Sequence, residues 1–157
     1  MRIVHLIIGL GDGGAERTLY KLVTADDSHV HGVISLTSQG KYGPLLSDRG
    51  VSVVSIEWSF STLFPSLFSL RRSLRVMKPE ILHGWMPHGA LVASAVKNLV
   101  GAKRVMWSIR ASNYGDGIRT SITRGIVKIL ARFSHHGPDK IFVVGQRALE
   151  THAEIGF

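Results

Sequence analysis

The stretch GLGDGGAERT, residues 9–18, decides the fold, because it follows a short apolar run and precedes a segment of helical period. Its Gly9, Gly11 and Gly14 have the G-x-G-x-x-G spacing of a dinucleotide-binding turn between a strand and a helix. Such a turn presents free backbone N–H groups at the positive end of a helix, where an anion binds. The alternative is that the glycines only form a tight turn, with Glu16 placed favourably in the helix dipole.

The dinucleotide interpretation requires a further residue that the chain lacks. An acidic side chain about 20 positions after the turn, at the tip of the second strand, would bind a ribose hydroxyl. That region reads ISLTSQG, and no Asp or Glu occurs from Val33 through Gly40. Gly13 and Gly14 nevertheless let a ligand approach the backbone closely. The pattern therefore favours an anion-binding turn and weakens the dinucleotide interpretation.

Short runs rich in Val and Ile alternate with segments of helical period along the whole chain. This alternation is typical of a parallel sheet with crossover helices. Strands are predicted at residues 2–10, 30–37, 51–57, 81–84, 104–109 and 140–144. Helices are predicted between them, including 63–77, which Pro79 ends, and 146–155 after the last strand. The predicted fold class is α/β: a Rossmann-like open parallel sheet flanked by helices on both faces, in three layers.

Composition and charge fit one globular domain with anionic partners. The 157 residues are 45% hydrophobic, enough for one core, and the lack of cysteine excludes disulfides and points to a reducing compartment. No apolar stretch approaches the roughly 20 residues that a membrane span needs. The net charge of +8 is concentrated in residues 71–157, which hold fourteen Lys/Arg against five Asp/Glu. This half would attract phosphorylated substrates, lipid headgroups or nucleic acid.

Four stretches resemble the N-terminal domain of family 4 glycosyltransferases, the group 1 sugar transferases of GT-B fold. IVHLIIGLGDGGAERTLYKLV is similar to the family's first strand, its Gly-Gly-Ala-Glu turn and an amphipathic helix. ILHGWMPHGALVASAV resembles the fourth strand and helix, VMWSIRASN the fifth strand and its loop. KIFVVGQRALETHAEIGF resembles the sixth strand and the helix before the second domain. Only the four-residue turn is sharply patterned, and the other stretches match through their order and spacing.

The resemblance implies that residues 1–157 are the acceptor-binding half of a two-domain GT-B enzyme whose nucleotide-sugar domain is absent from this chain. Such enzymes transfer a sugar from a nucleotide-sugar donor to a glycan or lipid-linked acceptor, usually with retention of configuration and without a cofactor or metal. The paired glutamates that bind the donor lie in the other half, so we expect this fragment alone to be inactive. Family habit further implies polysaccharide biosynthesis in the cytoplasm, peripheral to the inner face of the membrane.

The candidate site lies at the carboxyl ends of the predicted strands, where ligands bind in an open parallel sheet. The candidates for binding substrate or diphosphate are Gly13, Gly14, His83 and Asn113. The candidates for a catalytic role are Arg110 and His88. We expect no metal site, because no third ligand has suitable spacing from the two histidines.

Each candidate side chain has a structural alternative. Arg110 ends an apolar strand, and its planar guanidinium suits phosphate oxygens, but it could equally pair with a buried carboxylate or cap a helix. Many relatives place a histidine in this loop, and this sequence does not. His83 and His88 could bind sugar hydroxyls or, if protonated, phosphate, although a histidine more often satisfies a backbone carbonyl. Asn113, beside Tyr114, could contact a sugar or shape a turn.

Two predicted helices carry basic residues. Arg124, Lys128 and Arg132 share one helix face, and a second set, Arg71, Arg72, Arg75 and Lys78, follows Phe64, Leu67 and Phe68. The apolar residues of both helices are expected to pack on the sheet. A solvated basic face is the default interpretation. The sharper hypothesis is peripheral contact with an anionic membrane that carries a lipid-linked acceptor.

Two functions of other classes stay open. A dinucleotide-binding domain of an oxidoreductase would use the glycine turn despite the missing acid. A basic nucleic-acid-binding module would use the charge, but the aromatic residues form no recognisable motif for reading RNA or DNA, so nucleic acid is not an expected partner.

Overall fold

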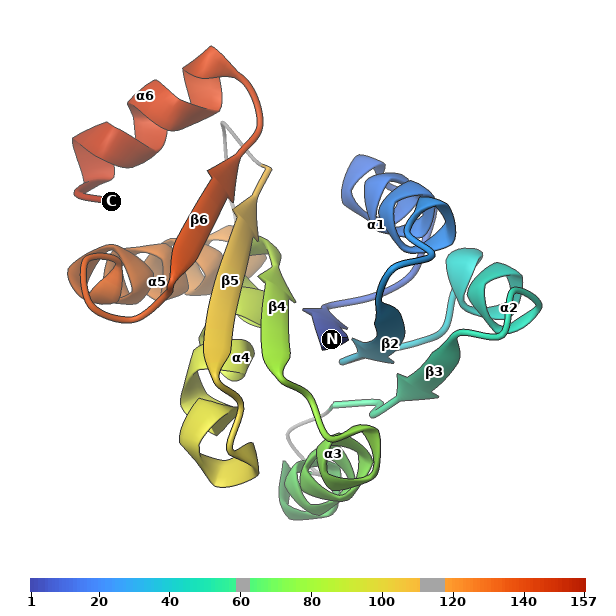
Figure 1. Ribbon diagram of the computed structural model, residues 1–157. Helices are drawn as coiled ribbons and strands as arrows, with labels where there is room; N and C mark the ends of the chain where they lie inside the picture. Colours follow the sequence, from blue (N-terminus) through green and yellow to red (C-terminus); the bar gives the residue numbers. More distant parts are fainter. Residues whose placement is uncertain (59–62, 111–117) are drawn as a thin grey trace.

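The computed structural model describes residues 1–58, 63–110 and 118–157 and has an α/β architecture (Figure 1). Its six-stranded parallel sheet has the order β3-β2-β1-β4-β5-β6. The strands are β1 (Arg2–Ile7), β2 (Val30–Ser35), β3 (Ser52–Ser55), β4 (Ile81–Trp85), β5 (Arg104–Ile109) and β6 (Lys140–Val143). The helices are α1 (Gly14–Ala25), α2 (Tyr42–Ser47), α3 (Leu63–Met77), α4 (Met86–Val100), α5 (Ile118–Phe133) and α6 (Gln146–Ile155). The predicted Rossmann-like fold class is confirmed.

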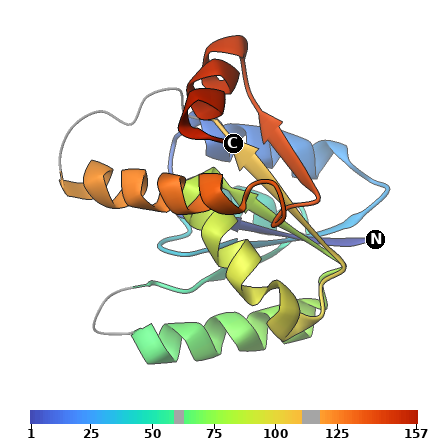
Figure 2. The ribbon, with the colours of Figure 1, turned by 90° about the vertical axis from the view of Figure 1, so that its left-hand side faces the viewer.

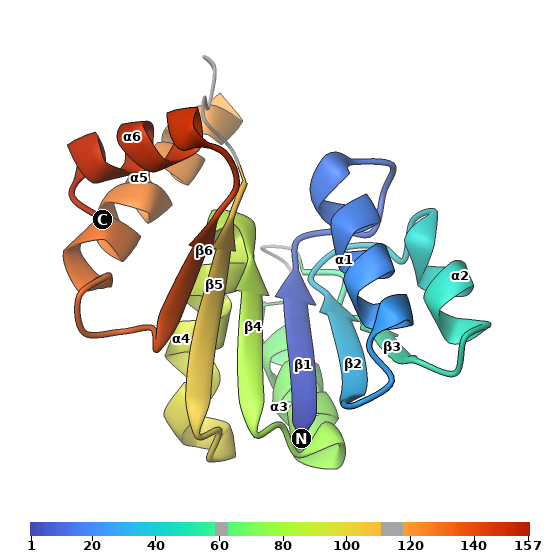
Figure 3. The ribbon, with the colours of Figure 1, turned by 45° about the horizontal axis from the view of Figure 1, so that its top comes forward.

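Helices cover both faces of the sheet, and the alternation of side chains along the strands assigns each face its own core. On β1, Leu6 belongs to the core under α3, α4 and α5, whereas Ile7 belongs to the core under α1 and α2. Figure 3 shows α1 and α2 in front of the sheet and α3 and α4 behind it. Figure 2 shows α3, α4 and α5 stacked side by side. The predicted three layers are therefore present.

The first strand is shorter than its sequence predicts. The apolar run extends to Leu10, but β1 ends at Ile7. The backbone carbonyls that follow are bound by the loop after β2: the Thr37 hydroxyl donates to Ile8 O at 2.5 Å, and the Tyr42 N–H donates to Leu10 O at 2.9 Å. Residues 8–10 thus form a fixed loop at the edge of the sheet rather than a continuation of the strand.

Two glycines bring α4 into direct contact with the sheet. A Cβ atom added to Gly89 would meet the carbonyl oxygen of Leu6, and one added to Gly84 would meet the backbone of Ala90. No other residue fits this approach without moving the helix. The contact holds the first turn of α4 against the ends of β1 and β4.

Helix α3 packs differently from the prediction. Leu70 and Leu74 are fully buried in the core, whereas Phe64 and Phe68 are 84% and 70% exposed. The prediction that these phenylalanines pack on the sheet was wrong, because the register of α3 turns Leu70 and Leu74 inward instead.

In the described ranges, every helix is too short or too polar to cross a membrane.

Candidate functional site

The order of the sheet reverses between β1 and β4, and ligands of open parallel sheets bind at such a switch point, beyond the carboxyl ends of the strands. The loop after β1 and the first turn of α4 after β4 meet there. Between them lies a pocket of about 540 Å³, which we call the switch-point pocket. Its lining consists of Ile8, Gly14, Ala15, Glu16, Met86, Pro87, His88, Arg110 and Thr123.

A second pocket of about 640 Å³ adjoins the first and is mostly apolar. Ile8, His88 and Thr123 line both pockets. The remaining lining of this adjoining apolar pocket is Leu36, Thr37, Trp58, Leu91, Val92, Ile122 and Ile126. The arrangement can hold a ligand whose polar group lies in the switch-point pocket and whose apolar part lies in its neighbour.

The glycine turn opens the N-terminus of α1 toward the switch-point pocket. Gly13 is the N-cap residue in an extended conformation, and no side chain caps the first turn by a hydrogen bond. Gly14 lines the pocket, so its backbone N–H lies at the positive end of the helix and beside the cavity. Gly13 does not line the pocket, although it adjoins Gly14 in the same turn. The turn can therefore bind an anion through its amides.

The carboxylate of Glu16 lies beside this turn. A Cβ atom added to Gly13 would collide with the Glu16 carboxylate, which shows how closely the side chain folds back over the start of its own helix. The placement matches the alternative in which Glu16 interacts with the helix dipole. The turn thus has the features of both interpretations: amides without a side-chain cap, and the Glu16 carboxylate at the positive end of the helix. An anion that binds these amides must displace the Glu16 side chain.

The loop between β2 and α2 fixes the position of the glycine turn. Lys41 Nζ forms an ion pair with Asp12 Oδ2 at 2.8 Å. Gly40 has a φ of 46°, and a Cβ atom there would meet the carbonyl oxygen of Leu10 and, at 2.7 Å, the backbone nitrogen of Gly11. Both the left-handed conformation and the close approach require glycine at position 40.

Arg110 lies at the carboxyl end of β5 and lines the switch-point pocket. Its guanidinium carbon lies 5.9 Å from the centroid of the Trp85 ring, a distance at which cation and ring attract each other. In the part of the chain that the structure describes, no carboxylate forms an ion pair with Arg110. The guanidinium is therefore held by the ring and can donate hydrogen bonds into the pocket.

His88 lies in the first turn of α4 and lines both pockets. Partial burial lowers its pKa below the ordinary value of 6.5. The neutral imidazole therefore predominates at neutral pH, and it can both donate and accept a hydrogen bond. These properties suit contact with a sugar hydroxyl.

His83 does not reach either pocket. We expected it at a strand end, but β4 continues to Trp85, and His83 is buried within the strand on the α1 side of the sheet. Its Nε2 lies 2.8 Å from the Ser108 hydroxyl. Burial, with a smaller contribution from His31, lowers the pKa of His83 to about 4. The side chain is a neutral part of the core.

A row of buried hydrogen bonds crosses the same face of the sheet. Trp85 Nε1 donates to His5 Nδ1 at 3.1 Å, which leaves the Nε2 of His5 as the donor to His31 Nδ1 at 3.0 Å. His31 Nε2 then donates to the Asp26 carboxylate at 3.1 Å. Sequence reasoning missed this row, because it joins residues from three strands. Its one signal is the occurrence of histidine inside two apolar runs.

Of the predicted site residues, the structure brings Gly14, His88 and Arg110 together in one pocket. Asn113 and its neighbour Tyr114 lie outside the described residues. Sequence reasoning missed Thr123 of α5 and the unusual Met86, whose φ of 60° is rare for a residue with a side chain. Among the described residues, no group of three His, Cys, Asp or Glu side chains is arranged to hold a metal ion.

Comparison with known proteins shows likeness in structure only. No protein-family model and no characterised protein sequence matches the chain. The structure is similar to Anabaena HepE in complex with UDP, with a TM-score of 0.74 and 13% identity over 99% of this chain. It is also similar to HepE in complex with UDP and glucose, with a TM-score of 0.71 and 13% identity over 99% of this chain. Acinetobacter baumannii MurG has a TM-score of 0.50 and 16% identity over 80% of this chain.

HepE and MurG are GT-B glycosyltransferases. This chain spans 41% of the length of the HepE chain and 39% of the MurG chain. The fold of the described residues is therefore that of a GT-B half-domain.

Proposed function

We propose that this chain is the acceptor-binding half of a retaining glycosyltransferase, which transfers a sugar from a nucleotide sugar to a glycan or lipid-linked acceptor. The observation that carries the proposal is the pair of joined pockets at the switch point: one is lined by Gly14 and Arg110, and the other is more strongly apolar. The GT-B fold supports a glycosyltransferase, and the complexes of HepE with UDP and glucose support a nucleotide-sugar donor.

The switch-point pocket suits a reaction that releases a diphosphate. Negative charge develops on the departing diphosphate in the transition state, and oriented donors stabilise it. Arg110 and the backbone N–H of Gly14 supply such donors from two different loops of the pocket wall. The neutral imidazole of His88 is placed to orient an acceptor hydroxyl and to accept its proton as the new bond forms.

A second domain would complete the enzyme. This chain spans about two fifths of HepE, and among the described residues the lining of the two pockets includes one carboxylate, that of Glu16, and not a pair that could bind the hydroxyls of a donor nucleotide. We propose that the donor nucleotide binds mainly to that other domain and that the isolated chain does not turn over. The work of the enzyme would be polysaccharide assembly on the cytoplasmic side of the membrane, with no cofactor or metal.

Glycosyl transfer by the complete protein that contains this chain tests the proposal. We would supply radiolabelled nucleotide sugars, beginning with UDP-glucose, and measure label in a membrane-lipid extract and in oligosaccharides. Arg110→Gln should lower kcat/KM by about 10- to 100-fold, the usual effect of removing a charged hydrogen bond. Arg49→Gln and His135→Asn, at exposed positions outside the pockets, are the controls. A folded protein that transfers no sugar from any donor would contradict the proposal.

The strand order leaves one competing function to exclude. Dinucleotide-binding domains have the same order, with the dinucleotide at the same switch point. In this chain the tip of β2 carries Thr37 where an acid would bind the ribose, and the Thr37 hydroxyl already donates to Ile8 O. Titration of the chain with NAD, measured by calorimetry, distinguishes the glycosyltransferase from the oxidoreductase, because tight binding of NAD would favour the oxidoreductase.

A further inference from the structure

The buried hydrogen bonds on the α1 side of the sheet form a continuous row, here called the histidine row, through Asp26, His31, His5 and Trp85. The strand register places His31 two residues before His5 and Trp85 two residues after it, so the row advances toward the carboxyl ends of the strands. It begins at Asp26, whose side chain is 27% exposed, and ends at Trp85, beneath Arg110 of the switch-point pocket. The row therefore connects solvent at one edge of the sheet with the pocket at the other.

The bonds of the histidine row fix one arrangement of protons. The indole N–H of Trp85 can only donate, so Nδ1 of His5 accepts and its Nε2 carries the proton. Nδ1 of His31 then accepts from His5, and the Nε2–H of His31 donates to the Asp26 carboxylate. Both imidazoles are therefore neutral. An added proton on either ring makes two N–H groups face each other, and one hydrogen bond of the row must break.

An added proton acts on the indole at the far end of the row. It enters at His31, the imidazole bonded to the partly exposed Asp26. His31 then donates from both nitrogens, and His5 accepts this bond only if its own proton moves from Nε2 to Nδ1. Burial, with smaller contributions from neighbouring histidines, lowers the pKa of His5 well below 6.5, so His5 stays neutral. Its Nδ1–H then faces the indole N–H of Trp85, which loses its acceptor.

Trp85 supports two parts of the switch-point pocket. The guanidinium of Arg110 lies over its ring, 5.9 Å from the centroid. Trp85 is also the N-cap residue of α4, whose first turn adds Met86 and His88 to the pocket lining. Because Trp85 is only 1% exposed, its ring cannot turn without moving these neighbours.

We propose that the histidine row makes anion binding in the switch-point pocket dependent on pH. With both imidazoles neutral, the row holds Trp85 and, through it, Arg110 in the position that binds an anion. A proton on His31 breaks the row and weakens binding. His5, His31 and Trp85 are then positioning residues, because they act on the anion through Arg110. The proposal rests on the proposed function for the role of Arg110 as a ligand of the diphosphate.

Two further histidines lie beside the row. His29 precedes β2 and bonds to the same Asp26 oxygen at 2.8 Å, and a proton on His29 leaves every bond of the row intact. His83 of β4 lies 5.2 Å from His5 between ring centroids, but its Nε2 is bonded to the Ser108 hydroxyl. Burial lowers the pKa of His83 to about 4, so it stays mostly neutral above about pH 5.

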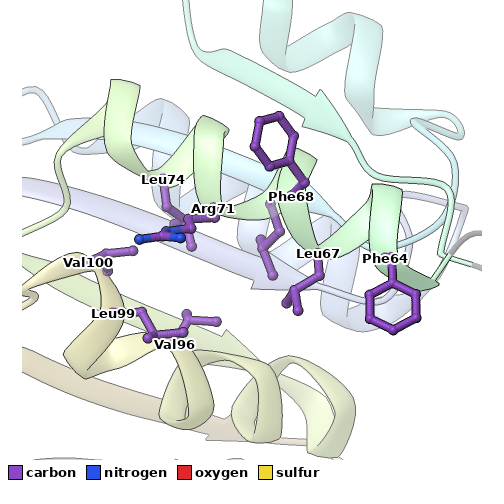
Figure 4. A pocket seen from close by; sticks show the side chains of 9 residues that line it. Phe64, Leu67, Phe68, Arg71, Leu74, Val96, Leu99 and Val100 are labelled. Atoms are coloured by element: carbon purple, nitrogen blue, oxygen red, sulfur yellow. The ribbon is translucent and has the colours of Figure 1, made fainter.

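The helices over the row present apolar side chains to it. Leu19 and Val23 of α1 and Leu46 of α2 belong to one core with Trp85. The core on the other face of the sheet is also mainly apolar, and leucines and valines line the space between α3 and α4 beside it (Figure 4). In such surroundings a broken bond of the row leaves a buried polar group without a partner.

The expected pH dependence is opposite to that of the titratable groups in the pocket. A proton on His88 adds positive charge beside a bound anion, and a proton on Glu16 removes negative charge. Both strengthen anion binding as the pH falls, whereas a proton in the row weakens it. For an anion that does not itself titrate, a loss of affinity on acidification therefore identifies the row as the cause.

Sulfate titrations at several pH values test the proposal, because sulfate keeps its full charge where histidine titrates. NMR spectra of the isotope-labelled chain at constant ionic strength measure the sulfate affinity and the indole N–H signals together. We expect the affinity to fall about tenfold from about pH 7.5 to 5.5, on the order of a lost hydrogen bond to a charged group. The Trp85 indole signal should shift over the same range. Saturating sulfate should move that shift to lower pH, because coupling between two sites is reciprocal.

Variants at different points of the row separate control of the pocket from a purely structural role. Trp85→Phe keeps a ring beneath Arg110 and removes the indole N–H. Its sulfate affinity at about pH 7.5 should fall only about two- to fivefold, and the further loss on acidification should disappear. His31→Gln, which takes up no proton in this range, should also bind sulfate equally at both pH values. Arg110→Gln should bind weakly at both, and circular dichroism checks that each variant is folded.

His29→Gln is the matched control, because it removes the other histidine bonded to Asp26 and should lose affinity on acidification as the unchanged chain does. Three results would overturn the proposal: no sulfate binding by the folded chain, an affinity that stays constant or rises as the pH falls, and equal pH profiles of His29→Gln and His31→Gln. Sugar transfer by the complete protein is measured separately. Transfer with a pH-independent sulfate affinity would leave only the proposed function, and a pH-dependent affinity without transfer would leave only the histidine row.

Discussion

Trp85 donates a hydrogen bond from its indole Nε1 to Nδ1 of His5 over 3.1 Å. The guanidinium of Arg110 lies over the same indole, 5.9 Å from the ring centroid. One ring thus links the buried row of histidines to the wall of the switch-point pocket. The position of Arg110 depends on Trp85, and the position of Trp85 depends on a histidine in the core.

Replacing His5 by phenylalanine should destabilise the fold. The variant removes the acceptor of Trp85 Nε1 and the donor to His31 Nδ1, and both groups stay buried. Buried polar groups without partners cost roughly 1–3 kcal/mol each, so the free energy of unfolding should fall by about 3 kcal/mol. Urea denaturation measures the change. His136→Asn, at an exposed position, should be neutral, and a His5→Phe variant as stable as the parent would contradict the inferred row of bonds.

The chain should lose stability as the pH falls from neutral toward about 4. Burial lowers the pKa of His83 from 6.5 to about 4, and it lowers the pKa of His5 well below 6.5. The unfolded state therefore binds more protons than the folded state below about pH 6.5, which shifts the equilibrium toward unfolding. His83 alone should contribute a loss approaching about 3 kcal/mol near pH 4, since each pKa unit is worth about 1.4 kcal/mol.

Urea denaturation of the unchanged chain and of His83→Gln, at pH 7 and again near pH 4.5, checks this expectation. The variant should lose less free energy of unfolding than the parent between the two pH values. Equal losses would show that His83 does not titrate as the structure implies. The exposed variant His135→Asn should behave as the parent does.

Gly89→Ala should be far more damaging than Gly125→Ala, although both glycines lie in helices. A Cβ atom on Gly89 meets the carbonyl oxygen of Leu6, whereas one on Gly125 meets nothing within 4 Å. Overpacking typically costs 1–3 kcal/mol, and a rigid backbone neighbour places this site at about 3 kcal/mol. Alanine on the open face of α5 should instead stabilise by up to about 1 kcal/mol. Equal stability of the two variants would disprove the close contact between α4 and β1.

The pair Gly40→Ala and Gly50→Ala separates backbone strain from collision. Both glycines have a positive φ, 46° and 77°, so alanine is strained at each by roughly 1 kcal/mol. Only a Cβ atom at position 40 meets the backbone of Leu10 and Gly11. Gly40→Ala should therefore cost more free energy of unfolding and should also lower sugar transfer by the complete protein. Similar effects of both variants, in urea denaturation and in transfer, would refute a role of Gly40 in fixing the glycine turn.

The sequence pattern predicts much of the fold because local signals agree along the chain. Pro79 follows the helix 63–77, and the structure ends α3 at Met77 with Lys78 at a φ of 46°. All six predicted strands are present in the sheet. Parallel strands covered by helices on both faces are apolar at consecutive positions, and the runs rich in Val and Ile have this pattern. The rule for open parallel sheets predicts a site at the end of the sheet where the structure has the two adjoining pockets.

The rest depends on contacts between residues far apart in the sequence. β4 continues past the predicted end to Trp85, so His83 lies within the strand, where its side chain is buried and hydrogen-bonded to Ser108 of the neighbouring strand. The helical period predicts an apolar stripe on α3 but not which of two stripes faces the core, and here Leu70 and Leu74 do. The pairing of His5 with His31 requires the register of β1 against β2, which no local signal encodes.

All strands of the sheet run in the same direction, so the edge where they begin and the edge where they end carry different parts of the chain (Figure 3). The carbonyl of Met1 accepts the N–H of Val30 at 3.0 Å on the edge where the strands begin. The length of β1, about 20 Å at 3.3 Å per residue, separates this edge from the switch-point pocket. An affinity tag or a surface tether joined ahead of Met1 would leave the pocket pointing away from an immobilising support. The chain is thus suited, as it stands, to ligand-capture screens on a sensor chip.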